Sequence, residues 1–170
     1  MDWKSIGGNR IFRIASVATF IASAYLAQPY RIAVIMGNSM SPTYHNHEVE
    51  LATTDLGTLK RGDVILVDGP SGVMVKRIAY LPGDWMEMRY LGDNWYPVAT
   101  LEKFENVRRP DKVPMTYARV PEGYVYVLGD NPIVSVDSRT LGALPIAGIH
   151  AKLIDPKSKD ESDPLPEIEL

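Results

Sequence analysis

After Pro29 the chain is a series of short apolar runs that are closely punctuated by glycine, proline and aspartate. The runs are rich in β-branched and aromatic residues, and they cover 32–36, 48–52, 64–67, 73–78, 85–90, 95–98 and 125–128. Runs of this length and composition are typical of β-strands, and the residues between them are typical of tight turns. The pattern therefore predicts an all-β domain built of hairpins.

Two stretches do not fit the strand pattern. Residues 101–118 are more charged and irregular, and they predict an extended insertion or a short helix. From Asp155 the chain turns to aspartate, glutamate, lysine, serine and proline without hydrophobic periodicity, which predicts a disordered tail. The expected organisation is an N-terminal segment over 1–30, a β-rich domain over 31–154 and a tail over 155–170.

Composition narrows the classes of function. The chain has 170 residues, enough to bury a core in one or at most two domains. Its net charge of −3 argues against a nucleic-acid partner, as does the lack of any basic cluster beyond Arg108-Arg109. The absence of cysteine excludes disulfides, thiolate catalysis and cysteine-ligated zinc, and it leaves the redox compartment open.

The N-terminal segment contains an apolar stretch in which no residue from Ile14 to Ala27 is charged. A helix over 11–30 would be ~30 Å long, about the thickness of the hydrocarbon core of a bilayer. Basic residues precede the stretch at Lys4, Arg10 and Arg13. The positive-inside rule then places the N-terminus in the cytoplasm, so the segment predicts a cytoplasmic stub followed by a single transmembrane anchor.

Two alternatives to an anchor remain open. Ala22-Ser23-Ala24 satisfies the small-x-small pattern of a signal-peptide cleavage site, so the segment also fits a cleavable signal peptide. Because the uncharged stretch is short, a buried helix of the globular core is the other alternative.

A serine and a lysine suggest catalysis. Ser39 follows the first strand-like run in a turn where Gly37 permits a backbone shape that a side chain would block, and Pro42 stiffens the exit. A lone serine in a turn is usually only a turn residue. However, Lys76 interrupts the apolar run 73–78, and no histidine lies in either stretch. Serine and lysine in this setting suggest a nucleophile–base pair.

Three motifs, met in order, resemble those of the type I signal peptidase family, Ser/Lys dyad peptidases of class S26. They are GxSMxPT over 37–43, KRxxxxPGD over 76–84 and GDNxxxSxDSR over 129–139. This family includes the bacterial leader peptidases and the mitochondrial inner-membrane proteases. The resemblance implies a mainly β fold, an antiparallel, barrel-like catalytic domain with one N-terminal transmembrane helix. It also implies cleavage of signal peptides after small residues at the −3 and −1 positions, without metal or cofactor.

The resemblance also implies roles for individual residues. Ser39 matches the nucleophile and Lys76 the general base. Ser135 matches a serine that hydrogen-bonds and orients the lysine, and Asp137 with Arg139 matches an ion pair that braces the site. A structural turn beside the site is matched by Gly129, Asp130 and Asn131.

The chemistry of a lysine base agrees with these roles. A free lysine has a pKa of ~10.4 and is protonated at pH 7, so Lys76 needs an apolar environment that lowers its pKa by ~2.5–3.5 units. The hydroxyl of Ser135 would aim a neutral amine without restoring its charge. The carboxylate of Asp137 would restore that charge, and Arg139 is its plausible ion-pair partner.

One position departs from the pattern of some bacterial relatives. They carry a serine two positions before the nucleophile, where its hydroxyl helps form the oxyanion hole, whereas this chain has Gly37. Other branches of the family carry glycine there too. The backbone N–H of Ser39 stays available, and the second donor is unassigned. Because loss of a donor costs ~10²–10³ in rate, we expect another group to fill the role.

Other residues carry competing interpretations. His45 and His47 with Glu48 and Glu50 suggest a metal site, but turn residues at the lip of a strand are the simpler account because no third ligand follows at a recognisable spacing. Arg77 is interpreted as a solvated neighbour or an ion-pair partner rather than a catalytic residue. His150 is expected at the surface or satisfied in the core. A core position or a membrane-facing surface is expected for Trp85, Trp95 and Tyr96.

The expected partners are the signal peptides of precursor proteins and the lipid bilayer. The expected location is a bacterial plasma membrane with the catalytic domain on its outer face. The alternative is a mitochondrial inner membrane with the domain facing the intermembrane space, where a partner subunit would also be possible. Two other functions stay open: a self-cleaving repressor-type Ser/Lys peptidase, and a non-catalytic, membrane-tethered β module that binds peptides.

Overall fold

The structure is a computed structural model, and it describes residues 3–91, 94–98 and 114–157. It divides into an N-terminal unit that ends at Tyr30 and a second unit that begins at Arg31.

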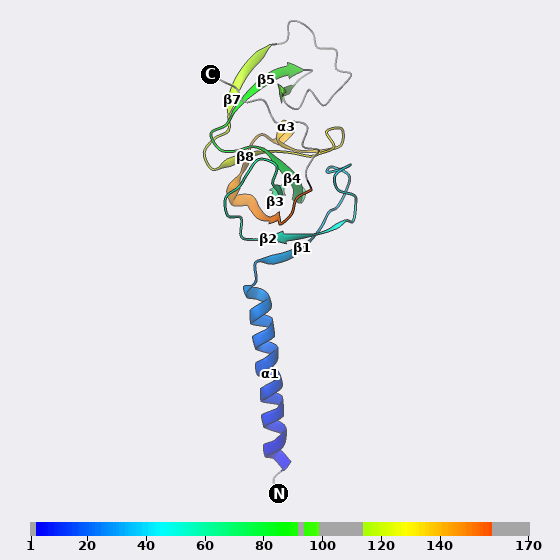
Figure 1. The fold of residues 1–170 in the computed structure, drawn as a ribbon, viewed down its shortest axis with the longest axis vertical. Coiled ribbons are helices and arrows are strands. Elements are labelled where there is room, and N and C mark those ends of the chain that lie inside the picture. The colour runs from blue at the N-terminus through cyan, green and yellow to red at the C-terminus, as the bar shows by residue number, and fades with distance from the viewer. Residues whose placement is uncertain (1–2, 92–93, 99–113, 158–170) are drawn as a thin grey trace. The chain divides into compact units, whose positions relative to one another are not determined.

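The N-terminal unit is a single continuous helix, α1 (Trp3–Ala27), of 25 residues (Figure 1). Its hydroxyl side chains bond back to the preceding turn, with Ser16 Oγ and Thr19 Oγ1 each 2.9 Å from a carbonyl oxygen four residues earlier. Measured by length and hydropathy together, no helix in the described part of the chain qualifies to cross a bilayer. The transmembrane anchor expected over 11–30 is therefore not confirmed, although the helix itself is present.

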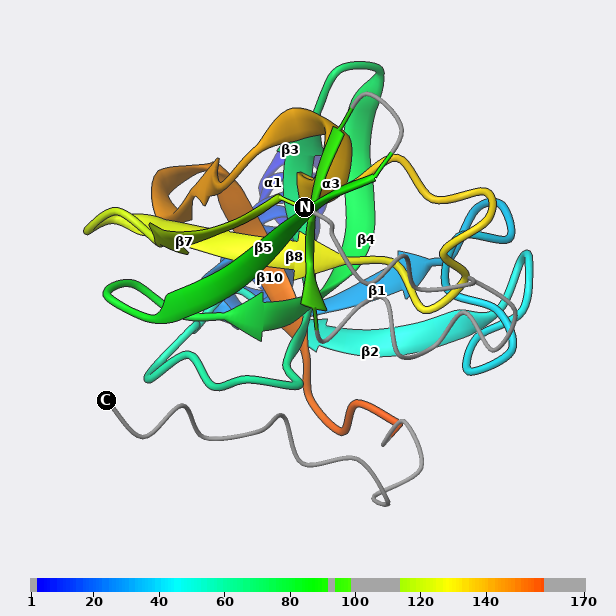
Figure 2. The same cartoon turned by 90° about the horizontal axis from the view of Figure 1, so that it is seen from above.

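The second unit is built on a seven-stranded sheet with the order β1-β2-β10-β3-β4-β8-β9 (Figures 1 and 2). Every strand pair whose register is described in it is antiparallel. Its strands are β1 (Tyr30–Val34), β2 (Val49–Thr53), β3 (Val64–Gly69), β4 (Gly72–Tyr80), β8 (Tyr124–Leu128), β9 (Leu144–Pro145) and β10 (Ile149–Leu153). The predicted antiparallel β fold is confirmed. The strand order has two edges, so over the described residues the sheet is open rather than barrel-closed.

A smaller sheet has the strand order β6-β5-β7 and is also antiparallel. Its strands are β5 (Trp85–Leu91), β6 (Asn94–Pro97) and β7 (Met115–Arg119), and a four-residue helix, α3 (Ser138–Leu141), follows β8. Trp85 and Trp95 lie on this sheet with 46% and 38% of their surface exposed, so of their two expected positions the core is wrong. Tyr96 on β6 is half-buried.

The central strand β4 carries the site. It pairs along its length with β3, from Val64 opposite Arg77 to Gly69 opposite Gly72. The tight turn of this hairpin requires a backbone φ of +119° at Gly72, which a glycine adopts without strain. Because β4 is covered by β3 on one edge and β8 on the other, its side chains have a fixed position within the sheet.

Two sequence-based expectations need correction or restriction. The stretch 101–118 was expected to be an insertion or a short helix, but Met115–Arg119 is strand β7, paired with β5. The prediction failed because the strand is short and its large apolar side chains, Met115 and Tyr117, are exposed, so its strand character follows from pairing with β5. Residues 99–113 lie outside the described residues, as does the expected tail from 158 onward.

Candidate active site

The nucleophile candidate lies on a loop that joins β1 to β2. Gly37 has a φ of +88°, and an added Cβ would meet nothing within 4 Å, so the backbone conformation rather than space favours glycine here. The backbone N–H of Gly37 donates to Asn46 Oδ1 at 2.7 Å. Beyond Ser39, the side chain of Met40 is fully buried. The loop therefore holds Ser39 between a hydrogen-bonded glycine and an anchored methionine.

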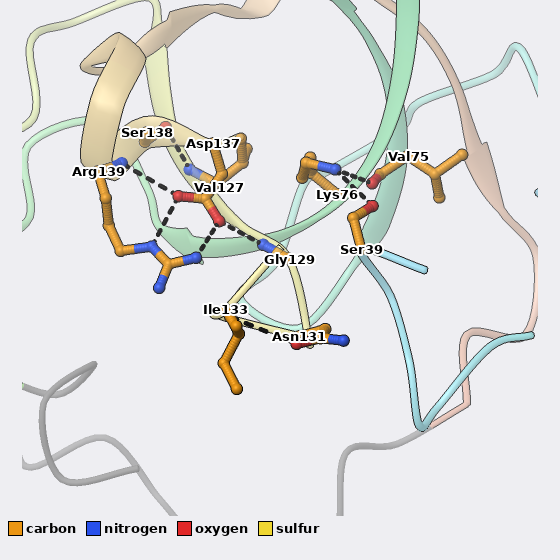
Figure 3. A network of polar contacts seen from close by, with 10 residues as sticks. All are labelled: Ser39, Val75, Lys76, Val127, Gly129, Asn131, Ile133, Asp137, Ser138 and Arg139. Carbon is orange, nitrogen blue, oxygen red and sulfur yellow. Dashed lines mark hydrogen bonds and ion pairs between the residues drawn. The ribbon is translucent and has the colours of Figure 1, made fainter. Parts of the chain in front are cut away.

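Lys76 reaches Ser39 from the middle of β4. Its Nζ donates to Ser39 Oγ at 2.8 Å and to the backbone oxygen of Val75 at 2.9 Å (Figure 3). Only 3% of the residue is exposed. Burial lowers the pKa of the Lys76 amine, and the charges of Asp137 and Asp130 oppose this only in part. The structure thus brings together a hydroxyl and a buried amine whose neutral form is favoured.

The Asp137–Arg139 pair lies at the start of α3. Arg139 donates to the Asp137 carboxylate through Nε at 2.8 Å and through Nη2 at 2.6 Å, and the backbone N–H of Gly129 donates to the same carboxylate at 2.9 Å (Figure 3). Burial raises the pKa of the Asp137 carboxyl, but these hydrogen bonds outweigh it and the net pKa is lowered. Asp137 is therefore a charged group whose hydrogen bonds are taken up by partners other than Lys76.

The second ion pair links β4 to the turn after β8. Arg77 donates to Asp130 through Nε at 3.0 Å and through Nη2 at 2.7 Å, and its Nη1 donates to the backbone oxygen of Gly62 at 2.9 Å. The interpretation of Arg77 as an ion-pair partner is confirmed, and that of a solvated side chain is wrong. The next residue of the turn, Asn131, donates its backbone N–H to the backbone oxygen of Ser39 at 2.9 Å.

Ser135 lies beside the site without the expected contact to the lysine. Its Oγ is buried, forms no hydrogen bond to Lys76 and helps to lower the pKa of the Asp137 carboxyl. A Cβ added to Gly129 would lie 2.1 Å from this Oγ and 2.5 Å from the backbone oxygen of Ser39. Ser135 and the nucleophile loop are thus packed against the same glycine, and the orientation of Lys76 by Ser135 stays a prediction.

The histidines lie outside this arrangement. The backbone N–H of His45 donates to Glu48 Oε2 at 2.8 Å, and His47 adopts a positive φ of 66°, as expected for turn residues. Among the described residues, no group of three or more histidine, aspartate or glutamate side chains is placed to hold a metal ion. His150 Nε2 lies 2.7 Å from Asp68 Oδ1 at the surface, so the first of the two expected positions of His150 is confirmed.

Comparison with known proteins decides the family. The model of "Signal peptidase, peptidase S26" matches residues 7–155. The chain belongs to this signal peptidase family. It is 34% identical over 139 residues to a signal peptidase I of Bacillus licheniformis, with 74% of this chain and 73% of the relative covered. It is 33% identical over 142 residues to signal peptidase I S of Bacillus subtilis, with 74% and 73% covered. The resemblance inferred from the three motifs is confirmed.

A solved structure is also similar. A signal peptidase I from Enterococcus faecalis is 26% identical, with 57% of this chain and 97% of that chain covered at a TM-score of 0.38. As a member of the signal peptidase family, the protein is an enzyme, a serine endopeptidase. The non-catalytic peptide-binding module is therefore set aside.

Three residues around the site of this signal peptidase were not found from the sequence. They are Asn46, Tyr44 and Lys157. Asn46 accepts a hydrogen bond from Gly37 within the nucleophile loop, and Lys157 bonds to Tyr44 and Glu48 of the same loop. Asn46 and Tyr44 lie in a turn whose sequence carries no motif, and Lys157 lies in the segment that was expected to be disordered. No local pattern marks them, because each acts through a contact that only the folded chain creates.

Proposed function

We propose that this signal peptidase removes signal peptides from precursor proteins, with Ser39 as nucleophile and Lys76 as general base. The observation that carries the proposal is the 2.8 Å distance between Lys76 Nζ and Ser39 Oγ at a site where Lys76 is almost fully buried. A proton can pass between these atoms without a bridging group. Burial supplies the lowered pKa that a lysine base requires.

The reaction follows from this contact. Neutral Lys76 takes the proton of the Ser39 hydroxyl while Oγ attacks the carbonyl carbon of the scissile bond. The ammonium then gives that proton to the leaving amine, the C–N bond breaks and an acyl-enzyme remains. Lys76 next takes a proton from a water molecule, whose oxygen attacks the ester, and the proton returns to Ser39 Oγ as the signal peptide leaves. Protons balance over the cycle, and the net reaction is hydrolysis.

The oxyanion formed in each half of the cycle needs donors. The backbone N–H of Ser39 is one candidate, because no described residue accepts a hydrogen bond from it. The N–H of Gly37 is occupied by Asn46 and is not the second donor in this arrangement.

Strand β1 offers a place for the substrate. It is at the edge of the larger sheet and leads directly into the nucleophile loop. An extended peptide can add to such an edge through backbone hydrogen bonds, with alternate side chains in pockets. We propose that the signal peptide binds in this way and that small residues at −3 and −1 face the site.

The proposed location is a bacterial membrane, with the catalytic unit on the outer face. The relatives reported above come from bacteria. Large apolar side chains of α1 are exposed to solvent in this structure. A membrane would bury them against its lipid chains. These side chains are Ile11, Phe12, Ile14, Val17, Phe20 and Ile21.

The test is cleavage, in detergent, of a precursor with alanine at −3 and −1 across a pH series. We expect the wild-type rate to rise with pH through an apparent pKa below that of free lysine, because the lysine must lose its proton. Ser39→Ala and Lys76→Met should lose cleavage by several orders of magnitude. Lys152→Met, which removes a lysine of β10 that pairs with Asp63 at 3.7 Å, is the matched control. Cleavage that survives Ser39→Ala would overturn the proposal.

A further inference from the structure

The segment after β10 ends against the nucleophile loop. The backbone N–H of Lys157 donates to Tyr44 Oη at 2.7 Å. The Lys157 ammonium bonds to Glu48 and lies 3.7 Å from Glu50, and it also lies 5.1 Å from the centre of the Tyr44 ring. One residue therefore contacts the loop at two points, near its middle and at its end.

Tyr44 connects this contact to the nucleophile. Its backbone N–H donates to the backbone oxygen of Met40 at 2.9 Å, which closes a turn immediately after Ser39. Tyr44 and Met40 are both fully buried in one hydrophobic cluster that also contains Ile35. Two buried anchors and a closed turn leave little freedom between Lys157 and Ser39.

Glu48 connects the second contact to the base of the loop. Its backbone oxygen accepts from the N–H of Ile35 at 2.8 Å, and the backbone oxygen of Ile35 accepts from the N–H of His47 at 2.7 Å. These bonds close the loop where it leaves β1 and enters β2. Lys157 thus ties the closed end of the loop to the turn that carries the nucleophile.

We propose that Lys157 and Tyr44 are positioning residues that hold Ser39 within reach of Lys76. The inference rests on the proposed function, since it assumes that the contact between Ser39 and Lys76 is catalytic. Lys76 is fixed by a central strand, whereas Ser39 is on a loop, so the distance between them depends on the tethers of the loop. A displacement of about 1 Å at a reacting atom can cost ~10²-fold in rate. Neither Lys157 nor Tyr44 touches the reacting atoms.

The contacts of Lys157 lie outside the motifs on which the family resemblance rests. Lys157 follows the last residue matched by the family model, residue 155. The positioning role is therefore argued from the contacts of this structure and not from the motifs.

The test compares full-length variants in the precursor assay, with an acylating, serine-directed probe to count competent sites. Tyr44→Phe keeps the ring and removes the acceptor of the Lys157 N–H, and Lys157→Met removes the ammonium. We expect kcat per titrated site to fall about tenfold in each, with KM within about twofold of wild type, because Ser39 is misplaced while the substrate still binds. Lys157→Arg should restore most of the loss, because a guanidinium can bond both Glu48 and Glu50.

Lys152→Met is again the control, since its ion pair with Asp63 is not part of the nucleophile loop. If Tyr44→Phe and Lys157→Met match this control in kcat per titrated site, the positioning role is wrong. The same conclusion follows if only the melting temperature or the number of titrated sites falls, or if KM alone changes. Retained cleavage in Ser39→Ala would instead refute the proposed function, so the two failures are distinguishable.

Discussion

Arg77 and Asp130 form a buried ion pair directly beside the contact between Ser39 and Lys76, with two hydrogen bonds of 3.0 Å and 2.7 Å. Their side chains are 11% and 2% exposed. Arg77 follows Lys76 in β4, and Asp130 precedes Asn131, whose N–H holds the backbone of Ser39. The pair therefore connects the strand of the base to the turn that supports the nucleophile.

Asp130→Asn should destabilise the protein strongly. It removes the charge that compensates the Arg77 guanidinium and leaves a buried cation poorly paired, which costs about 3–5 kcal/mol of unfolding free energy. Urea unfolding measures this directly. Asp68→Asn is the matched control, because Asp68 pairs with His150 at the surface with its side chain 66% exposed and should change stability by about 0.5 kcal/mol or less. Equal effects of the two variants would contradict a structural role for the buried pair.

Gly129→Ala should harm both stability and activity. The new methyl group would lie 2.1 Å from Ser135 Oγ and 2.5 Å from the backbone oxygen of Ser39, so the nucleophile loop must move. Overpacking of this kind costs about 1–3 kcal/mol. In Gly148→Ala the nearest atom would be Asp68 Oδ2 at 3.4 Å, so we expect little change there. The prediction is checked by thermal unfolding and precursor cleavage, and it fails if Gly129→Ala cleaves as fast as Gly148→Ala.

Ser135→Ala separates a catalytic contribution from a structural one. The buried Ser135 hydroxyl makes no contact with Lys76 and only helps to lower the pKa of the Asp137 carboxyl, so its removal should reduce stability by no more than about 1 kcal/mol. If Ser135 orients neutral Lys76 during catalysis, as the family resemblance implies, kcat should nevertheless fall by at least about tenfold. Melting temperature and kcat of the same preparation give the answer. Unchanged kcat would show that the hydroxyl does not orient the base.

The sequence predicted those strands whose apolar residues are consecutive, such as β3 and β4, because their burial is visible in the chain itself. It did not predict β10, where His150 and Lys152 alternate with buried Ile149, Ala151 and Leu153. Five residues with polar alternation are too short to stand out. Their strand character depends on pairing with β2 and β3, which lie far away in the sequence.

The candidate site likewise contains residues that the sequence pointed to and contacts that only the folded chain creates. The motifs pointed to Ser39 and Lys76, and the structure places them in contact, while their catalytic roles stay a prediction. The partners of Arg77 and the tether at Lys157 were not predictable in this form. Arg77 and Asp130 are 53 residues apart, and Tyr44 and Lys157 are 113 residues apart. Contacts over such separations follow from the fold rather than from local spacing.

The buried amine of Lys76 should make stability depend on pH. Burial lowers its pKa from an ordinary value of 10.5, although nearby carboxylates oppose the shift. Between the folded and the unfolded pKa, the unfolded chain binds more protons than the folded protein, so stability rises with pH across this window and levels off above 10.5. Below the window, the folded protein carries the unfavourable cost of a buried charge.

Lys76→Met, which replaces the amine with an apolar side chain of similar length, should therefore be more stable than wild type at neutral pH. The difference should shrink as the pH rises towards 10.5, since above this value the wild-type lysine is neutral in both states. Urea unfolding at several pH values between 7 and about 10 measures both curves. Lys152→Met removes an ion pair of β10, and its difference in stability from wild type should not shrink with pH in this way. A variant that is less stable than wild type by the same amount at every pH would mean that Lys76 stays protonated in the folded protein, and it would then be no base.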